Sequence, residues 1–372
     1  MTPESVPYIV AALAAGGIFA PVIVSSASVG LLRIILTAVA LALSIASIFC
    51  TTGTFAFGMI AVLLILRGVF ANKGTDLPKL PCIVSTLFAV AAAFTSEWPV
   101  LNLIAAVLLL ATLSGAWPMH WLAARVIDRS PLAMAEQIST CIVAMFAYLR
   151  FVAPTEFAFD AGSTLVRLGA VLALLPAITA LVQVNLRGFY RCVVAMHGGM
   201  LIAALGAAGH GHSAAALLVT VTLALAMGGL GAMVAAVEDR CGRVLLKDQG
   251  GRIWGMPRLA AAFLLFAASG VGMPGTAGFI ADDLLLHALW EESVAGSLIM
   301  IVAASLLAVA SLSTFAKIFL GPPATSLAGD LSRPERYVVV VTFGLLVLIG
   351  VAPWLLANPL AEYLRGFGAV PH

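Results

Sequence analysis

Charged residues are scarce in this chain of 372 residues. Lysine and arginine number 19 and aspartate and glutamate 17, so 10% of the residues are charged and 62% are hydrophobic. A water-soluble domain typically has about 25% charged residues, and the composition excludes that class. With a mean hydropathy of +1.11, the sequence predicts an all-α, polytopic transmembrane helix bundle that lies in the lipid bilayer and contacts its lipids.

The motifs of most catalytic chemistry are also missing. The five cysteines form no Cys-x-x-Cys pair, and we interpret them as small apolar fillers rather than metal ligands or disulfides. There is no phosphate-binding glycine loop with a lysine, no haem signature and no nucleophile elbow. We therefore expect no cofactor, no metal site and no catalytic reaction within this chain alone. The basic residues lie in loops, where membrane topology requires them, and predict no nucleic acid partner.

What the sequence does contain is a series of apolar windows of about 20 residues, the length that a helix needs to cross the hydrocarbon layer. We predict twelve spans, at 7–28, 31–50, 54–72, 81–97, 99–127, 131–150, 163–184, 188–209, 213–238, 257–290, 294–320 and 335–356. The fifth and the tenth are longer than needed and contain prolines and glycines, which remove donors and relax the backbone, so both are expected to be interrupted mid-membrane. The break residues are Trp117 and Pro118 in the first, and Gly272, Pro274 and Gly275 in the second.

The two predicted breaks lie five helices apart. A five-helix unit that is repeated once returns with inverted topology because five is odd, and paired broken helices are typical of transporters with inverted repeats. We therefore predict one membrane domain over residues 1–372, with five-helix units at about 31–150 and 163–320 and flanking helices at 7–28 and 335–356.

The distribution of basic residues predicts the orientation of the chain. If the N-terminus faces outward, all but three of the 19 lysines and arginines fall on one side, the exceptions being Arg150, Arg167 and Arg365. Because cytoplasmic loops carry the excess of basic residues, both termini are expected to be non-cytoplasmic.

Two adjacent carboxylates, Asp282 and Asp283, follow the second break. They begin 7 residues after Gly275, which is about 10 Å of helix. A carboxylate at bilayer depth costs roughly 3 kcal/mol and usually marks an ion or proton path. The alternative is that the second half-helix is short and both aspartates lie in an outer loop.

Three more titratable residues are candidates for a proton path. Glu136 begins a polar run inside the sixth span, although it could instead lie near the cytoplasmic surface and pair with Arg129 or Arg125. His197 lies mid-span beside two glycines and suits a proton relay, with a neutral structural histidine as the alternative. Lys317 lies one turn from a helix end, where snorkelling of its side chain toward the membrane surface is the alternative to a functional role.

Three segments together resemble a known family, the antiporter-like, proton-translocating membrane subunits of respiratory complex I (NADH:quinone oxidoreductase subunits L, M and N) and of Mrp-type cation/proton antiporters. The segments are Gly115–Leu122 around the first break, Asn185–Gly199, and Gly272–Phe279 at the second break. The resemblance of the middle segment places His197 at the position of a histidine in the family's pattern. The resemblance covers roughly residues 31–321. It implies that Asp282 stands at the position of the family's distal lysine or glutamate.

Departures from the family pattern make this a divergent and shortened member. The glutamate of the family's first unit has no counterpart in Thr54–Ala71, and the family's lysines fall on Leu113, on Val143 or Ala144, and near Leu223. The twelve predicted spans, in place of the family's usual fourteen, are compatible with loss of two N-terminal helices. The resemblance thus implies the fold more securely than a complete proton relay.

These observations lead to a hypothesis and three alternatives. The hypothesis is a proton-conducting subunit of a larger hetero-oligomeric complex in the bacterial cytoplasmic (inner) membrane, with other membrane subunits as partners, protons as the transported ion and Na⁺ as the alternative ion. The sequence leaves open whether the complex is a proton-translocating oxidoreductase, of which this chain would be a subunit. The alternatives are the coupling subunit of an inorganic-carbon uptake system, a structural subunit that keeps the fold without pumping, and a free-standing transporter.

Overall fold

The computed structural model of the protein describes residues 6–14, 31–69, 78–247, 250–322 and 329–365. Within these residues the chain is helical, and its extended structure is limited to an isolated bridge between Asn185 and Leu245. The predicted all-α architecture is confirmed. The elements are α2 (Leu31–Phe49), α3 (Gly53–Val69), α4 (Lys79–Phe94), α5 (Pro99–Ser114), α6 (His120–Arg129), α7 (Pro131–Phe151), α8 (Glu156–Ala180), α9 (Leu186–Gly209), α10 (Ser213–Thr222), the π-helix η2 (Leu223–Met227), α11 (Gly228–Cys241), the 3₁₀ turn η3 (Arg252–Trp254), α12 (Pro257–Gly270), α13 (Ala277–Glu292), α14 (Val294–Phe319), α15 (Arg333–Val351) and α16 (Trp354–Arg365).

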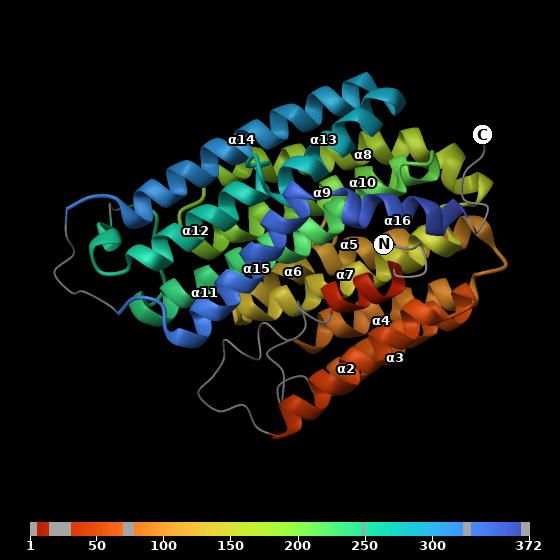
Figure 1. Ribbon diagram of the computed structural model, residues 1–372, viewed down its shortest axis with the longest axis horizontal. Coiled ribbons are helices and arrows are strands. Elements are labelled where there is room, and N and C mark those ends of the chain that lie inside the picture. Colours follow the sequence, from red (N-terminus) through yellow and green to blue (C-terminus); the bar gives the residue numbers. More distant parts are fainter. Residues whose placement is uncertain (1–5, 15–30, 70–77, 248–249, 323–328, 366–372) are drawn as a thin grey trace.

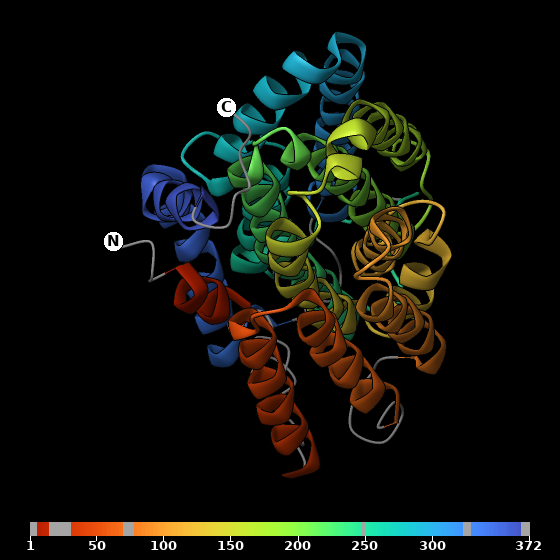
Figure 2. The same ribbon diagram turned by 90° about the vertical axis from the view of Figure 1, so that its right-hand side faces the viewer.

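The helices run mostly along one axis of an elongated bundle. Helices α2 and α3 form one edge, and α13 and α14 form the opposite edge (Figure 1, Figure 2). By length and composition, six described helical segments could cross a membrane: α7, α8, α9, the continuous run Ser213–Cys241, α14 and α15. The predicted span 7–28 is described only at residues 6–14, which are helical. The count of twelve spans and the inverted repeat stay predictions.

Three helical segments form the centre of the bundle. Helices α7 and α9 and the run Ser213–Cys241 are almost wholly buried, whereas α14 and α15 bury a minority of their residues. Small residues allow a close approach between α8 and α9, because a Cβ added at Gly169 would lie 2.3 Å from the amide nitrogen of Ala203. Close contact through small residues is the usual way in which membrane helices pack.

The backbone is interrupted at both predicted places. Helix α5 ends at Ser114, Gly115 follows with a φ of 76°, and α6 begins at His120. Helix α12 ends at Gly270, and α13 begins at Ala277. Gly272 and Gly275 between them have φ values of 80° and 86°, which only glycine adopts without strain.

The last predicted span, 335–356, differs from the structure. Helix α15 ends at Val351, and a separate helix, α16, begins at Trp354. Pro353 lies between them and has no backbone N–H, which explains why one continuous helix does not form. Gly350 packs against the second break, since a Cβ there would lie 2.2 Å from the carbonyl carbon of Thr276.

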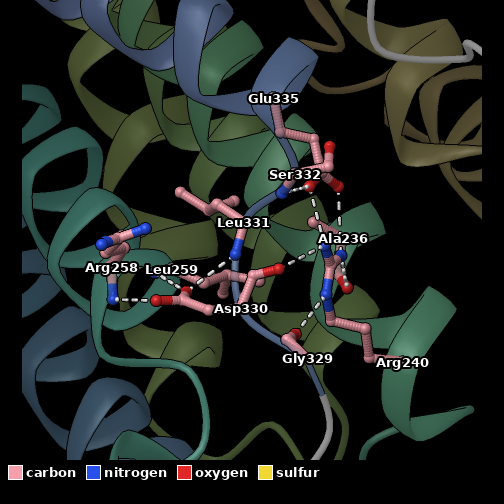
Figure 3. A network of polar contacts seen from close by, with 9 residues as sticks. All are labelled: Ala236, Arg240, Arg258, Leu259, Gly329, Asp330, Leu331, Ser332 and Glu335. Atoms are coloured by element: carbon pink, nitrogen blue, oxygen red, sulfur yellow. Dashed lines mark hydrogen bonds and ion pairs between the residues drawn. The ribbon is translucent and has the colours of Figure 1, made fainter.

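A polar network holds the first turns of α12 and α15 against the end of α11 (Figure 3). The guanidinium of Arg240 donates to both carboxylate oxygens of Glu335, at 3.1 and 2.7 Å, and also to the carbonyls of Gly329 and Asp330. The Asp330 carboxylate accepts from the backbone amides of Arg258 and Leu259 at the start of α12. The segment before α15 therefore caps the first half of the second broken helix.

Candidate functional site

His197 lies at the centre of the molecule and joins α9 to the second break. Its side chain is 2% exposed. Nδ1 lies 2.8 Å from the carbonyl oxygen of Val193 on the same helix, and Nε2 lies 2.7 Å from the carbonyl oxygen of Gly270, where α12 ends. The break frees this carbonyl from the helical hydrogen-bond pattern, and the imidazole occupies it.

The two contacts of His197 suit a group that gains and loses a proton. Carbonyl oxygens only accept, so each contact is a hydrogen bond only while the facing nitrogen carries hydrogen. Neutral imidazole has one N–H and imidazolium has two. A proton on either ring nitrogen therefore has a buried hydrogen-bond acceptor, and the imidazolium would bond to both carbonyls.

Asp282 and Asp283 lie in the first turns of α13 but in different surroundings. Asp282 is half-buried and turns back toward the break, because a Cβ added at Gly272 would lie 2.7 Å from its Oδ2. Within the described part of the chain the Asp282 carboxylate has no ion pair. The Asp283 side chain is 56% exposed, and its Oδ1 lies 3.7 Å from Nδ1 of His287. The structure thus separates the two predicted carboxylates.

Glu136 forms an ion pair with Arg67. In the predicted topology, Arg67 is one of the basic residues on the cytoplasmic side of the membrane. The Nε atom of Arg67 in α3 lies 3.9 Å from Oε1 of Glu136 in α7. The same guanidinium donates to Oγ1 of Thr140 at 2.5 Å and to the backbone carbonyl of Glu136 at 3.2 Å. The alternative pairing with Arg129 or Arg125 is wrong. Arg67 is 4% exposed and belongs to the interior rather than to a loop.

Gln137, the neighbour of Glu136, contacts the first break. Its amide nitrogen donates to the carbonyls of Thr112 and Leu113, at 2.9 and 3.4 Å, in the last turn of α5. The other side of this break touches α9, since a Cβ at Gly198 would lie 2.6 Å from the amide nitrogen of Ala116. Gly198 directly follows His197, so the first break contacts the helix that carries the histidine.

We call Glu136, Gln137, His197 and Asp282 the polar axis, because Gln137 contacts the first break, Glu136 directly precedes Gln137 in α7, and His197 and Asp282 lie at the second break. The first two lie on the side of the first break, and Asp282 lies on the side of the second. His197 bridges the two, because α9 touches one break through Gly198 and the other through its imidazole. The hydroxyls of Thr222 and Ser269, near the second break, are buried without a hydrogen-bond partner among the described residues. Buried hydroxyls of this kind are typical sites for ordered water.

Lys317, the remaining candidate from the sequence, and two further histidines, His210 and His212, are not part of the polar axis. Lys317 is half-buried in the last turn of α14, and its carbonyl accepts from the amide of Gly250 at 2.9 Å. His210 and His212 pair with Glu292 and Glu291, with distances of 3.0 and 3.1 Å. Among the described residues there is no cluster of three or more side chains arranged to bind a metal ion.

Arg67 is the main residue that the sequence analysis missed. A single arginine inside the apolar run Thr54–Ala71 was the available signal, because a charge within a span is rarely accidental. Leu113 and Leu223, which the resemblance puts at or near positions of family lysines, are fully buried. Leu223 is also the first residue of η2, a π-helix, and such turns are frequent at functional sites.

The fold and the site define a class, an integral membrane protein built of helices, two of them interrupted, around a buried polar axis. A family model described as "NADH:quinone oxidoreductase/Mrp antiporter, TM" matches residues 22–309. The chain belongs to this family of antiporter-like membrane subunits.

Individual relatives agree with this assignment. NADH-quinone oxidoreductase subunit M of Rhodobacter capsulatus is 22% identical over 253 residues, which is 65% of this chain and 49% of the relative. Subunit M of Mycobacterium tuberculosis is 24% identical over 246 residues, which is 64% of this chain and 44% of the relative. The matched segment thus spans about half the length of these curated relatives.

Solved structures share the fold at low sequence identity. A chain of respiratory complex I from Thermus thermophilus superimposes with a TM-score of 0.84 at 18% identity, covering 100% of this chain and 85% of the other. A chain of the Mrp complex from Dietzia sp. DQ12-45-1b gives 0.76 at 14% identity, covering 98% and 83%. An archaeal membrane-bound sulfane sulfur reductase gives 0.79 at 16%, covering 95% and 66%.

Proposed function

We propose that this chain conducts protons across the membrane as the antiporter-like subunit of a larger ion-translocating complex. Protons pass along the polar axis, between Glu136 on the side of the first break and Asp282 on the side of the second. His197 exchanges protons between the two halves, and ordered water at Thr222 and Ser269 completes the second half. Asp283 and Lys317, which were also predicted for the path, lie outside it.

The observation that carries this proposal is the position of His197. One titratable side chain, buried and facing a backbone carbonyl oxygen at each ring nitrogen, touches the second break directly and lies next to the glycine that touches the first. Interrupted helices are tolerated at membrane depth where their backbone is buried in protein or lines a wet cavity. Two such interruptions that touch one helix at neighbouring residues, His197 and Gly198, favour transfer of a small ion over a purely mechanical role.

The chain requires partners for this function. Its described residues contain no group that supplies energy, so a redox module, a Na⁺ gradient or the proton gradient itself drives the transfer through other membrane subunits. The relatives named above are subunits of such complexes. We place the protein in the bacterial cytoplasmic membrane with both termini non-cytoplasmic, which is the orientation that the basic residues favour.

Substitution of the two neighbouring aspartates tests the proposal. The complex, or the full chain reconstituted in liposomes, is compared as wild type, Asp282→Asn and Asp283→Asn, and proton uptake is followed with a pH-sensitive dye. Asp282→Asn should abolish proton flux, whereas Asp283→Asn, which changes the same chemistry at an exposed position one residue away, should retain it. Unchanged flux in Asp282→Asn would exclude this path.

One observation favours a second candidate function, that of a structural subunit. The resemblance puts family lysines at Leu113 and near Leu223, and both of these leucine side chains are fully buried. In that case the polar axis serves helix packing alone. Wild-type liposomes would then show no proton flux above that of empty liposomes, although the complex would fall apart without the subunit.

A further inference from the structure

A cavity of about 520 Å³ opens on the side of the bundle between α6, α8 and α9. It lies away from the polar axis, and the proposed proton path does not use it. Residues of α6 and of the first break form one wall, among them Trp117, His120 and Trp121. The opposite wall is formed by Leu175 of α8 and by Arg191 of α9, together with other residues of these helices and the loop between them.

One end of the cavity is positively charged. Arg191 lines it, and the Nε atom of this residue is buried without a hydrogen-bond partner among the described residues. The Nη2 atom of Arg191 pairs with Asp128. The charge of Arg243 acts on Arg191, and the guanidinium of Arg125 lies 5.1 Å from the ring centroid of Trp121. Neither Arg125 nor Arg243 has an ion pair among the described residues, so the surroundings of the cavity carry an excess of positive charge, which is complementary to an anion.

The rest of the cavity is apolar or aromatic. Trp117 and Trp121 are 48% and 42% exposed, and their rings offer a large apolar surface to a bound molecule. Leu175 continues into a row of exposed apolar side chains on α8, which are Leu168, Val171 and Ile178. A hydrocarbon chain can leave the cavity along this row. The cavity is thus polar and cationic at one end and apolar at the other.

We propose that this cavity binds one anionic phospholipid. The phosphate lies at Arg191, with Gln183 as a second donor, and the acyl chains lie against the two tryptophans and α8. Basic pockets between membrane helices are known to select anionic headgroups. The proposal is independent of proton conduction, since no residue of the polar axis lines the cavity.

Native mass spectrometry of the purified full-length chain tests this proposal. The protein is mixed with phosphatidylglycerol or with phosphatidylcholine of identical acyl chains, and the lipid that remains bound is counted. We expect preferential retention of one phosphatidylglycerol. Arg191→Gln should weaken it about fivefold, the effect of one cationic side chain near an anionic lipid. Ala124→Phe, which fills the cavity without removing a charge, should weaken it as well.

Two controls test whether the bound molecule is a lipid and whether it binds in this cavity. Arg333→Gln removes an exposed cation at the start of α15 and should leave retention unchanged. Glycerol phosphate and inorganic phosphate test whether a free anion suffices, and competition by either at millimolar concentration would overturn the assignment to a lipid. Equal retention of both lipids, or an equal loss in Arg333→Gln, would also overturn it.

A photoreactive residue placed at Leu175 identifies the occupant in native membranes. A phospholipid adduct supports the proposal, whereas an adduct with another protein shows that a partner subunit covers the cavity and overturns it. All variants are first compared with wild type by size-exclusion elution and melting temperature, so that a loss of lipid is not confused with a loss of fold.

Discussion

Nε2 of His197 in α9 lies 2.7 Å from the carbonyl oxygen of Gly270, the last residue of α12. This contact connects the most buried histidine of the described chain to the end of a broken helix. His197 therefore holds α9 against the end of α12 and is also a candidate proton relay, and the two roles can be separated by experiment.

Two substitutions of His197 should differ in stability but not in proton flux. His197→Ala leaves the Gly270 carbonyl buried and unpaired, which should lower the free energy of unfolding by about 1–3 kcal/mol. His197→Gln keeps a donor for this carbonyl and should cost less, although an amide does not titrate. Both should abolish proton flux in liposomes, and thermal unfolding in detergent measures the stability. Wild-type flux in His197→Gln would assign the residue a structural role only.

The Arg67–Glu136 pair should stabilise the protein only while both charges are present. Glu136→Gln leaves a buried guanidinium without a counter-charge and should cost about 3–5 kcal/mol. The double variant Arg67→Met with Glu136→Met should recover most of that loss, since apolar replacements of buried pairs are often neutral. Thr140→Val, which removes a neutral partner of Arg67, should cost less than Glu136→Gln. The free energy of unfolding is measured for these variants and for the two single methionine variants. If the change in the double variant equalled the sum of the changes in Arg67→Met and Glu136→Met, the pairing would be contradicted.

Gly350 in α15 should tolerate no side chain. An added Cβ would lie 2.2 Å from the carbonyl carbon of Thr276, and backbone atoms at the second break cannot move without shifting α13. We expect Gly350→Ala to lower stability by about 1–3 kcal/mol and to reduce proton flux. Gly344→Ala is the matched control, because no atom lies within 4 Å of its added Cβ in the same helix. Similar melting temperatures of the two variants would show that α15 can shift at the Gly350–Thr276 contact with little loss of stability.

The Arg240–Glu335 contact should couple the ends of α11 and α15. Arg240→Gln and Glu335→Gln each break a two-fold hydrogen-bonded ion pair, and a double-mutant cycle should give a coupling energy of about 0.5–3 kcal/mol. Hydrogen exchange of residues 329–335 should accelerate in either variant, because the loop loses its anchor on α11. Arg333→Gln should leave both measurements unchanged. A coupling energy near zero would mean that the Asp330 contacts alone hold this segment.

Residue patterns close in sequence were enough to predict the helical class and the two interruptions. Long apolar windows have one solution in a bilayer, because every backbone polar group must be bonded within its own segment. Proline and glycine act on the backbone of their own turn, so the gaps at Gly115–Met119 and at Val271–Thr276 follow from local sequence. The interruption at Pro353 carried the same signal, but the predicted span placed it inside a helix near the end of the chain.

The partners of the buried charges could not be predicted. Arg67 and Glu136 are 69 residues apart, and their pairing depends on the packing of α3 against α7. Similarly, Asp282 and Asp283 have equal side chains and adjacent positions, and only the rotation of α13 turns one toward the break and leaves the other exposed.

The sequence by itself determined that this protein lies in a membrane, that it is helical and where two of its helices break, because these properties follow from hydropathy and local backbone chemistry. The tertiary structure decided that His197 joins the two breaks, that Arg67 is the partner of Glu136 and that Asp282 rather than Asp283 faces inward. These relationships depend on how helices distant in sequence approach and rotate, and close packing of small residues sets that geometry.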